Sequence, residues 1–210
     1  MAKQFFEDRR PHNGLTFQEY IDKFAEKVVT LDPDALDDKQ RQSWEAKRLN
    51  YQRNQRVMKT YQVPDELKAA VRQFQIPQLW MIITEDWCGD SAQTLAQIYK
   101  IAEESDHITI RIVLRDSNMD IMEEYLTDGK MGVPKVVSFD EAGNELFQWG
   151  PRPEEAADLF KEAAEQGIPT NEIYPRLHLW YGRDRGKSLD REFLEIFKTL
   201  NDEVAALVDA

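Results

Sequence analysis

The chain has 210 residues, of which 41% are hydrophobic and 31% charged, with a formal net charge of −12. No stretch reaches the roughly 18 apolar residues that a membrane-spanning helix requires, and the first residues lack the apolar core of a secretory signal. The negative charge disfavours nucleic acids and anionic membranes as partners. The single cysteine, Cys88, excludes an internal disulfide, and the three histidines are too far apart in sequence to suggest a metal site. We therefore expect a cytoplasmic protein without a bound metal, in which His107 and His178 are ordinary structural residues.

Residues 1–63 are predicted to form a helical extension. Thr16 and Glu19 make a capping-box pattern, and the apolar residues that follow repeat at helical spacing up to Val28. A longer helix is expected up to about Tyr61; its apolar face, Trp44, Tyr51 and Met58, would dock on the rest of the protein. Residues 37–59 carry a net charge of +4, which leaves −16 for the remainder. We interpret this basic stretch as a solvated helix face lying across an acidic body, or alternatively as a docking surface for an acidic partner.

Residues 64–167 alternate between helices and strands. Pro64 begins a helix, and residues 79–83 form a continuous apolar run that is typical of a buried central strand. A helix, a strand over residues 107–114 and a short helix capped by Asp116 follow. Residues 135–139 and 145–149 are predicted to form a β-hairpin, and Pro153 begins a helix that runs to about Glu165. Helices between strands imply parallel crossovers, so we predict the α/β class with a mixed sheet.

Residues 168–210 form a predicted C-terminal extension. A helix is expected from about Ser188, with an apolar face at Leu189, Phe193, Leu194, Phe197 and Leu200. Because such a face needs a partner, we expect this extension to pack on the central domain or on the N-terminal helices.

One motif stands where the buried strand ends and a helix begins, the pentapeptide Trp87-Cys88-Gly89-Asp90-Ser91. Pro134 stands 46 residues after Cys88, in Gly-Val-Pro before a strand, and Gly150 follows the hairpin. At these positions the chain resembles the thioredoxin family over about residues 64–167. The resemblance implies a thioredoxin-like fold, a central mixed sheet flanked by helices, with helical extensions at both ends. Residues 150–153 and 180–184 are similar to a bacterial group of thioredoxin-like proteins that carry such extensions.

The motif also predicts a chemistry. A cysteine at a helix N-terminus is favoured as the thiolate, the species that attacks disulfides. Ser91 stands where a dithiol enzyme has its second cysteine, and its hydroxyl can hydrogen-bond to a thiolate but cannot resolve a mixed disulfide. Asp90 replaces the proline of the family motif, and Ile82 stands where thioredoxins bury an acid. We therefore predict a monothiol thiol–disulfide oxidoreductase with Cys88, Ser91 and Asp90 in its catalytic site and an external resolving thiol.

The pKa of Cys88 is expected to lie near that of a free thiol. The helix N-terminus lowers it, whereas the neighbouring carboxylates of Glu85, Asp86 and Asp90 raise it, and we expect the two effects nearly to cancel.

The resemblance further implies a substrate-binding surface around the thiol. Trp87 would face the substrate, and the backbone of Val133, before a cis Pro134, would pair with an extended chain. Gly89 and Gly150 complete the predicted surface, whose partners would be protein or small-molecule disulfides. No cofactor is expected other than a low-molecular-weight thiol as co-substrate.

Two alternatives remain open at the level of sequence. In the first alternative, the protein is a binding module without redox activity: Cys88 is a small buried apolar residue, and the groove around Trp87 and Pro134 holds a polypeptide without turnover. In the second the chain carries an iron–sulfur cluster, because Cys-Gly-Asp-Ser resembles the Cys-Gly-Phe-Ser of monothiol glutaredoxins. The preceding tryptophan, the aspartate in place of the aromatic residue and the long N-terminal extension count against the second.

Overall fold

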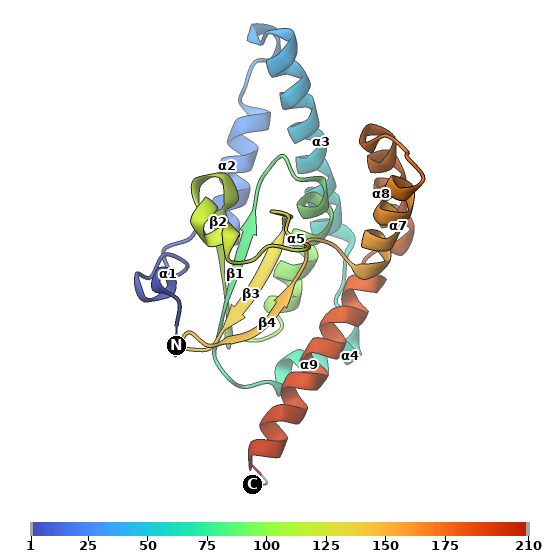
Figure 1. Ribbon diagram of the computed structural model, residues 1–210. Coiled ribbons are helices and arrows are strands. Elements are labelled where there is room, and N and C mark those ends of the chain that lie inside the picture. Colours follow the sequence, from blue (N-terminus) through green and yellow to red (C-terminus); the bar gives the residue numbers. More distant parts are fainter. Residues whose placement is uncertain (1, 209–210) are drawn as a thin grey trace.

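A four-stranded mixed sheet forms the centre of the computed structural model, which describes residues 2–208 (Figure 1). Its strands are β1 (Gln78–Thr84), β2 (Ile108–Leu114), β3 (Lys135–Phe139) and β4 (Glu145–Trp149), in the order β2-β1-β3-β4. β1 pairs in parallel with β2 and antiparallel with β3, and β3 pairs antiparallel with β4. The predicted α/β class, with a parallel crossover and a terminal hairpin, is confirmed.

Two clusters of buried side chains cover the two faces of the sheet. Because successive strand residues point to opposite faces, Trp80 and Ile82 enter one cluster while Met81 and Ile83 enter the other. The first cluster includes side chains of α2 (Phe17–Val29), α4 (Asp65–Gln73), α5 (Gly89–Ala102) and α9 (Lys187–Val208). The second includes α1 (Gln4–Glu7) and α6 (Met119–Glu123). No helix in residues 2–208 is both long and apolar enough to cross a membrane.

The N-terminal helices α2 and α3 (Asp38–Thr60) form a hairpin that projects beyond the sheet, in blue at the top of Figure 1. The predicted capping box of Thr16 and Glu19 is present at α2. Two residues of the predicted docking face of α3, Tyr51 and Met58, pack partly buried against the core, but the fully buried residues of this helix are Asn50, Asn54 and Val57, which were not predicted. These three face α5, whereas Tyr51 turns toward Phe24 of α2 and stays partly exposed.

Two further differences concern short segments of the chain. A single 3-10 turn, η2 (Arg115–Ser117), contains Asp116, and α6 begins only after Asn118. The predicted capping of a helix by Asp116 is therefore wrong. The predicted N-terminal helical extension also contains α1, a short helix that no local pattern had marked, whose Phe5 and Phe6 pack against Phe139 of the sheet.

The C-terminal half contains three helices, which are α7 (Glu154–Glu165), α8 (Thr170–Asp184) and α9. α7 and α8 pack against each other beside the sheet, and α9 packs its aromatic side chains against Trp80 of β1 (orange and red in Figure 1). The predicted apolar face of α9 is buried except for the partly exposed Leu194, with Phe193 5.6 Å from Trp80 between ring centroids. α8 lies within the predicted helical extension of residues 168–210, but its bounds were not predicted, and it contains Pro175 at an interior position that proline opposes.

Candidate functional site

Cys88 lies where the loop after β1 turns into α5, and it is the N-cap residue of that helix. The backbone amide of Ser91 donates to Sγ at 3.5 Å, and the thiol donates to the backbone oxygen of Val133 at 3.0 Å. The Val133–Pro134 peptide bond is cis. Two segments separated by more than forty residues in the sequence thus meet at the sulfur atom.

The thiol of Cys88 is held in its protonated form. Its side chain is buried, with the residue 7% exposed, and burial raises its pKa to about 11. The negative charge of Asp90 acts in the same direction, while hydrogen bonds from Ser91 and the Asp90 backbone act against it. The expected cancellation therefore fails, because it omitted the burial of the sulfur.

The Asp90 carboxylate is buried and joins the motif to the C-terminal half. It accepts hydrogen bonds of 2.7 Å from Arg152, in the loop after β4, and from the hydroxyl of Tyr181 in α8. Burial raises the pKa of Asp90, and both partners oppose that rise. Both partners lie in segments that the sequence comparison singled out, residues 150–153 and 180–184, but their contact with Asp90 was not predicted, because each lies more than sixty residues away from it in the sequence.

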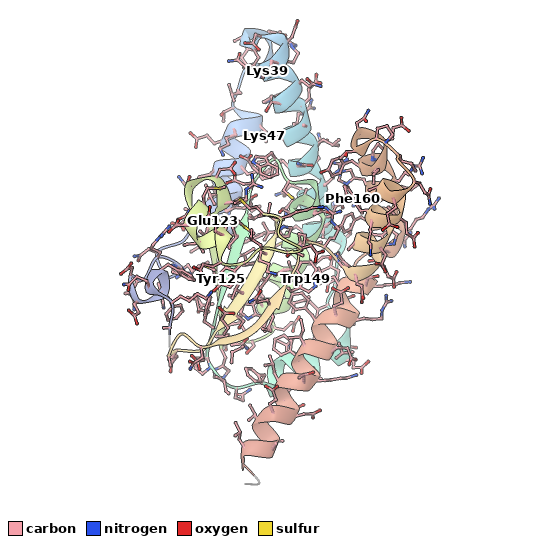
Figure 2. The ribbon with its side chains drawn as sticks, in the orientation of Figure 1. Lys39, Lys47, Glu123, Tyr125, Trp149 and Phe160 are labelled. Atoms are coloured by element: carbon pink, nitrogen blue, oxygen red, sulfur yellow. The ribbon has the colours of Figure 1, made fainter. Side chains whose placement is uncertain are left out.

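A second buried carboxylate, Asp86, fastens the loop that precedes the cysteine. Lys27 of α2 and Lys47 of α3 contact it at 2.5 and 3.3 Å. Asn50 donates from its side-chain amide to the backbone oxygen of Trp87 at 3.0 Å. The basic stretch of α3 therefore does not form only a solvated face: Lys47 lies against the body of the protein, whereas Lys39 lies near the tip of the hairpin (Figure 2).

Trp87 presents an aromatic surface next to the thiol. The residue is 42% exposed, with the Arg115 guanidinium 4.5 Å from the ring centroid and Asp116 accepting its indole N–H at 3.2 Å. The backbone amide of Asp116 in turn donates to the buried Glu85, whose pKa is raised by burial. This chain of contacts fixes the ring while leaving one face open to solvent.

Ser91 and Gly89 both pack inward. The Ser91 hydroxyl accepts from Thr84 at 2.7 Å, and the residue is 2% exposed. A Cβ added at Gly89 would lie 2.8 Å from the ring of His178, so glycine lets α8 approach the motif. Burial lowers the pKa of His178 to about 4, so its ring is neutral at pH 7, with Nδ1 3.3 Å from the Gln93 amide nitrogen.

Gly150 allows the hairpin to close against the proline loop. Its φ is +110°, and a Cβ there would lie 2.2 Å from the backbone oxygen of Pro134. Since any side chain would collide with backbone, only glycine fits this position. The eight residues predicted for the site thus form one continuous cluster around the end of β1 and the start of α5.

The fold and the arrangement of the site agree with the protein family whose model matches this chain. A family model described as thioredoxin matches residues 38–165, which is more than half of the chain and includes the whole sheet. The chain belongs to the thioredoxin family. The comparison with curated proteins finds no match.

Two solved structures share the fold. One is a protein of unknown function from Pseudomonas aeruginosa, with 16% identity and a TM-score of 0.54, covering 88% of this chain and 98% of that one. The other is an HIV epitope scaffold, with 19% identity and a TM-score of 0.53, covering 88% of this chain and 99% of that one. At these identities the likeness concerns the fold alone.

In this thioredoxin-family site, Cys88 and Ser91 stand at the two positions of a dithiol motif, and the strand residue behind the motif is apolar. Ile82, on the strand behind the motif, is fully buried among apolar side chains. Across residues 2–208, no group of three or more His, Cys, Asp or Glu side chains is placed to hold a metal ion. What the arrangement offers chemically is a thiol between helix amides and a backbone carbonyl, beside an exposed aromatic ring.

Proposed function

We propose that this thioredoxin-family protein carries out monothiol thiol–disulfide exchange through Cys88. The observation that supports the proposal most directly is the position of Sγ, between the first amides of α5 and the backbone oxygen of Val133. Helix amides stabilise a thiolate, and the carbonyl belongs to an irregular segment beside which an extended chain can lie.

The exchange takes place in two steps. The Cys88 thiol loses its proton to solvent, and the thiolate attacks one sulfur of a protein or small-molecule disulfide. The new Cys88–sulfur bond forms while the old disulfide breaks, and its second sulfur leaves with the electron pair as a thiolate. Ser91 cannot open the mixed disulfide, so an external low-molecular-weight thiolate attacks the substrate sulfur and releases the Cys88 thiolate.

Substrate binding itself promotes the first step. The thiol proton is held by the Val133 oxygen, and this bond stabilises the unreactive form. An extended substrate that donates a backbone N–H to the same oxygen competes with the thiol and weakens that stabilisation. The exposed ring of Trp87 adds apolar contact for the residue that carries the disulfide.

Release of a chromophoric thiol from an aromatic disulfide tests the proposal. One equivalent per chain is expected under native conditions, Cys88→Ser should give none, and Ser91→Ala should match the parent in stoichiometry. The parent, mixed with a disulfide-bonded peptide, should also form a covalent adduct that dithiothreitol reverses. Release only at the rate of global unfolding, measured by hydrogen exchange on the same sample, would contradict the proposal.

A second candidate is a peptide-binding module without turnover. The burial of Cys88 and its pKa of about 11 favour it, because both slow thiolate formation. In that case Cys88→Ser should bind an extended peptide as tightly as the parent, whereas Trp87→Ala should weaken binding. Calorimetry with a peptide that lacks cysteine separates this candidate from exchange chemistry.

A further inference from the structure

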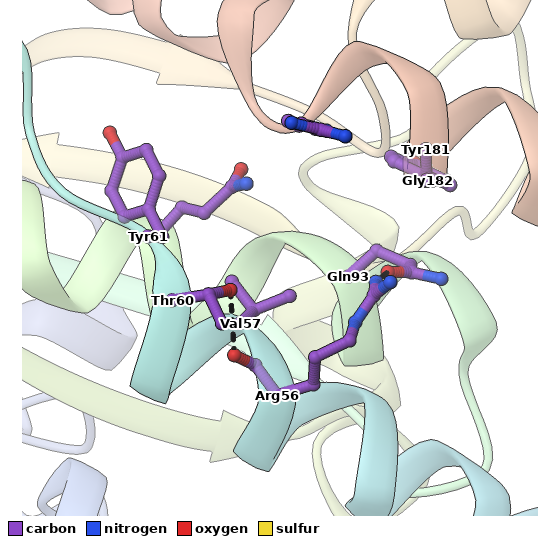
Figure 3. A pocket seen from close by; sticks show the side chains of 9 residues that line it. Arg56, Val57, Thr60, Tyr61, Gln93, Tyr181 and Gly182 are labelled. Carbon is purple, nitrogen blue, oxygen red and sulfur yellow. Dashed lines mark hydrogen bonds between the residues drawn. The ribbon is translucent and has the colours of Figure 1, made fainter.

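A cavity of about 400 Å³ lies between α3, α5 and the end of α8 (Figure 3). Arg56 and Gln93 lie along its lower side in the view, from α3 and α5, and Tyr181 lies at its upper edge on α8. The volume is within the range of small-molecule sites, which is roughly 300–1,000 Å³.

The side chains around this cavity are polar and carry charge of one sign. Two arginines, Arg56 and Arg185, line it, and no Asp or Glu is among its lining residues. Arg56 donates to the Gln93 side-chain oxygen at 2.9 Å, which is a neutral partner. Within residues 2–208, neither arginine forms an ion pair with a carboxylate.

The acids that lie closest in sequence to Arg185 are occupied elsewhere. Asp184 accepts from the backbone amide of Gly186 at 3.0 Å and from the hydroxyl of Ser188 at 2.7 Å. Asp190 accepts the hydroxyl proton of Tyr61. Neither acid pairs with Arg185, so the guanidinium remains available to an anionic ligand.

A neutral amide also lines the cavity. Gln97 is 6% exposed as a residue, but its side-chain amide is not among the fully buried polar groups of residues 2–208 that lack a partner, so solvent in the cavity reaches it. Its nitrogen lies against Gly186, where an added Cβ would come within 2.4 Å. A ligand that enters the cavity can therefore replace solvent as the hydrogen-bond partner of this amide.

We propose that the cavity binds a small molecule bearing a carboxylate or phosphate group. Arg56 and Arg185 take the oxyanion, because a guanidinium presents paired N–H donors to two oxygens at once. Gln97 supplies a neutral donor from α5. The inference does not depend on the redox proposal, although Tyr181 belongs both to this cavity and to the contacts of Asp90.

Side-chain amide resonances provide the test. The ¹⁵N-labelled full chain is titrated at low ionic strength, in one arm with inorganic phosphate and in the other with glutarate. The Gln97 cross-peaks, assigned by their loss in Gln97→Leu, should shift and saturate in at least one arm, and the responsive arm names the oxyanion. Removing one guanidinium removes charge-assisted hydrogen bonds, so Arg56→Gln and Arg185→Gln should each weaken binding at least about tenfold.

Lys59→Gln is the matched control, since Lys59 is an exposed cation of α3 that does not line the cavity. It should change the dissociation constant less than twofold. Loss of binding in Lys59→Gln equal to that in Arg56→Gln would show diffuse attraction and overturn the proposal. The proposal would also be overturned if the Gln97 resonances shifted in neither titration while circular dichroism showed that the protein was still folded.

Discussion

Replacing Asp90 with asparagine removes one buried negative charge and keeps the shape of the side chain. The carboxylate is 5% exposed and the Arg152 side chain 14% exposed, so their 2.7 Å contact is screened little by solvent. Removing one partner of a buried pair costs about 3–5 kcal/mol, and the amide oxygen still accepts from one donor. We therefore expect a loss near the lower end, about 3 kcal/mol in the free energy of unfolding.

The same change should make Cys88 more reactive. Asp90 is the carboxylate that raises the pKa of this thiol after burial, and a like charge within about 4–6 Å shifts a pKa by about one unit or more. One unit gives about tenfold more thiolate at neutral pH. Because nucleophilicity falls as the pKa falls, with a Brønsted coefficient of about 0.4–0.5, alkylation should become about three- to fourfold faster.

Alkylation by iodoacetamide, followed by mass spectrometry between pH 6 and pH 9 (roughly the range below the thiol pKa), measures the effect. Asp86→Asn is the control, because Asp86 is as buried as Asp90 but is not among the groups that raise the pKa of Cys88. It should leave the alkylation rate unchanged. Equal acceleration by both variants would indicate local opening of the motif and refute the electrostatic argument, and so would a slower rate in Asp90→Asn.

Three further predictions concern packing, spacing and pH. Gly150→Ala should lower the free energy of unfolding, measured by urea denaturation, by at least about 3 kcal/mol, because the new Cβ would collide with the backbone. Gly167 also has a positive φ but lies in open space, so Gly167→Ala should lower it by only about 1 kcal/mol. Ser91→Cys should lose two hydrogens on oxidation, because Cys88 and residue 91 face each other across the first turn of α5; a product that forms only dimers would contradict the geometry. Burial raises the pKa of Asp190 from 3.8 to about 6, so the folded state holds this proton more tightly, and the stability it contributes is lost as pH rises from about 4 to 6. The free energy of unfolding, measured by urea denaturation at each pH, should fall by at most about 3 kcal/mol across this window. Asp190→Asn should remove this pH dependence, and a pH profile unchanged by the substitution would show that the group does not titrate there.

The fold was predictable from the sequence wherever periodicity and local chemistry agreed. The capping box at Thr16, the continuous apolar run of β1 and the two five-residue runs of the hairpin each specify one local structure. The bounds of α8 were not predictable in the same way, because Pro175 interrupts its local helical pattern and the helix packs against α7, which lies elsewhere in the chain. The docking face of α3 was predicted only in part, because its fully buried positions include Asn50 and Asn54, which hydrophobic spacing cannot detect.

The sequence by itself determined the composition of the site: one cysteine before a helix, a serine one turn later, and a glycine and a proline at family spacing. These features are local, so the residue types alone carry them. Only the tertiary structure decided how the site behaves. Burial sets the pKa of Cys88, and the charge of Asp90 depends on Arg152 and Tyr181 from distant segments. Desolvation and ion pairing depend on distances in space, which sequence separation does not encode.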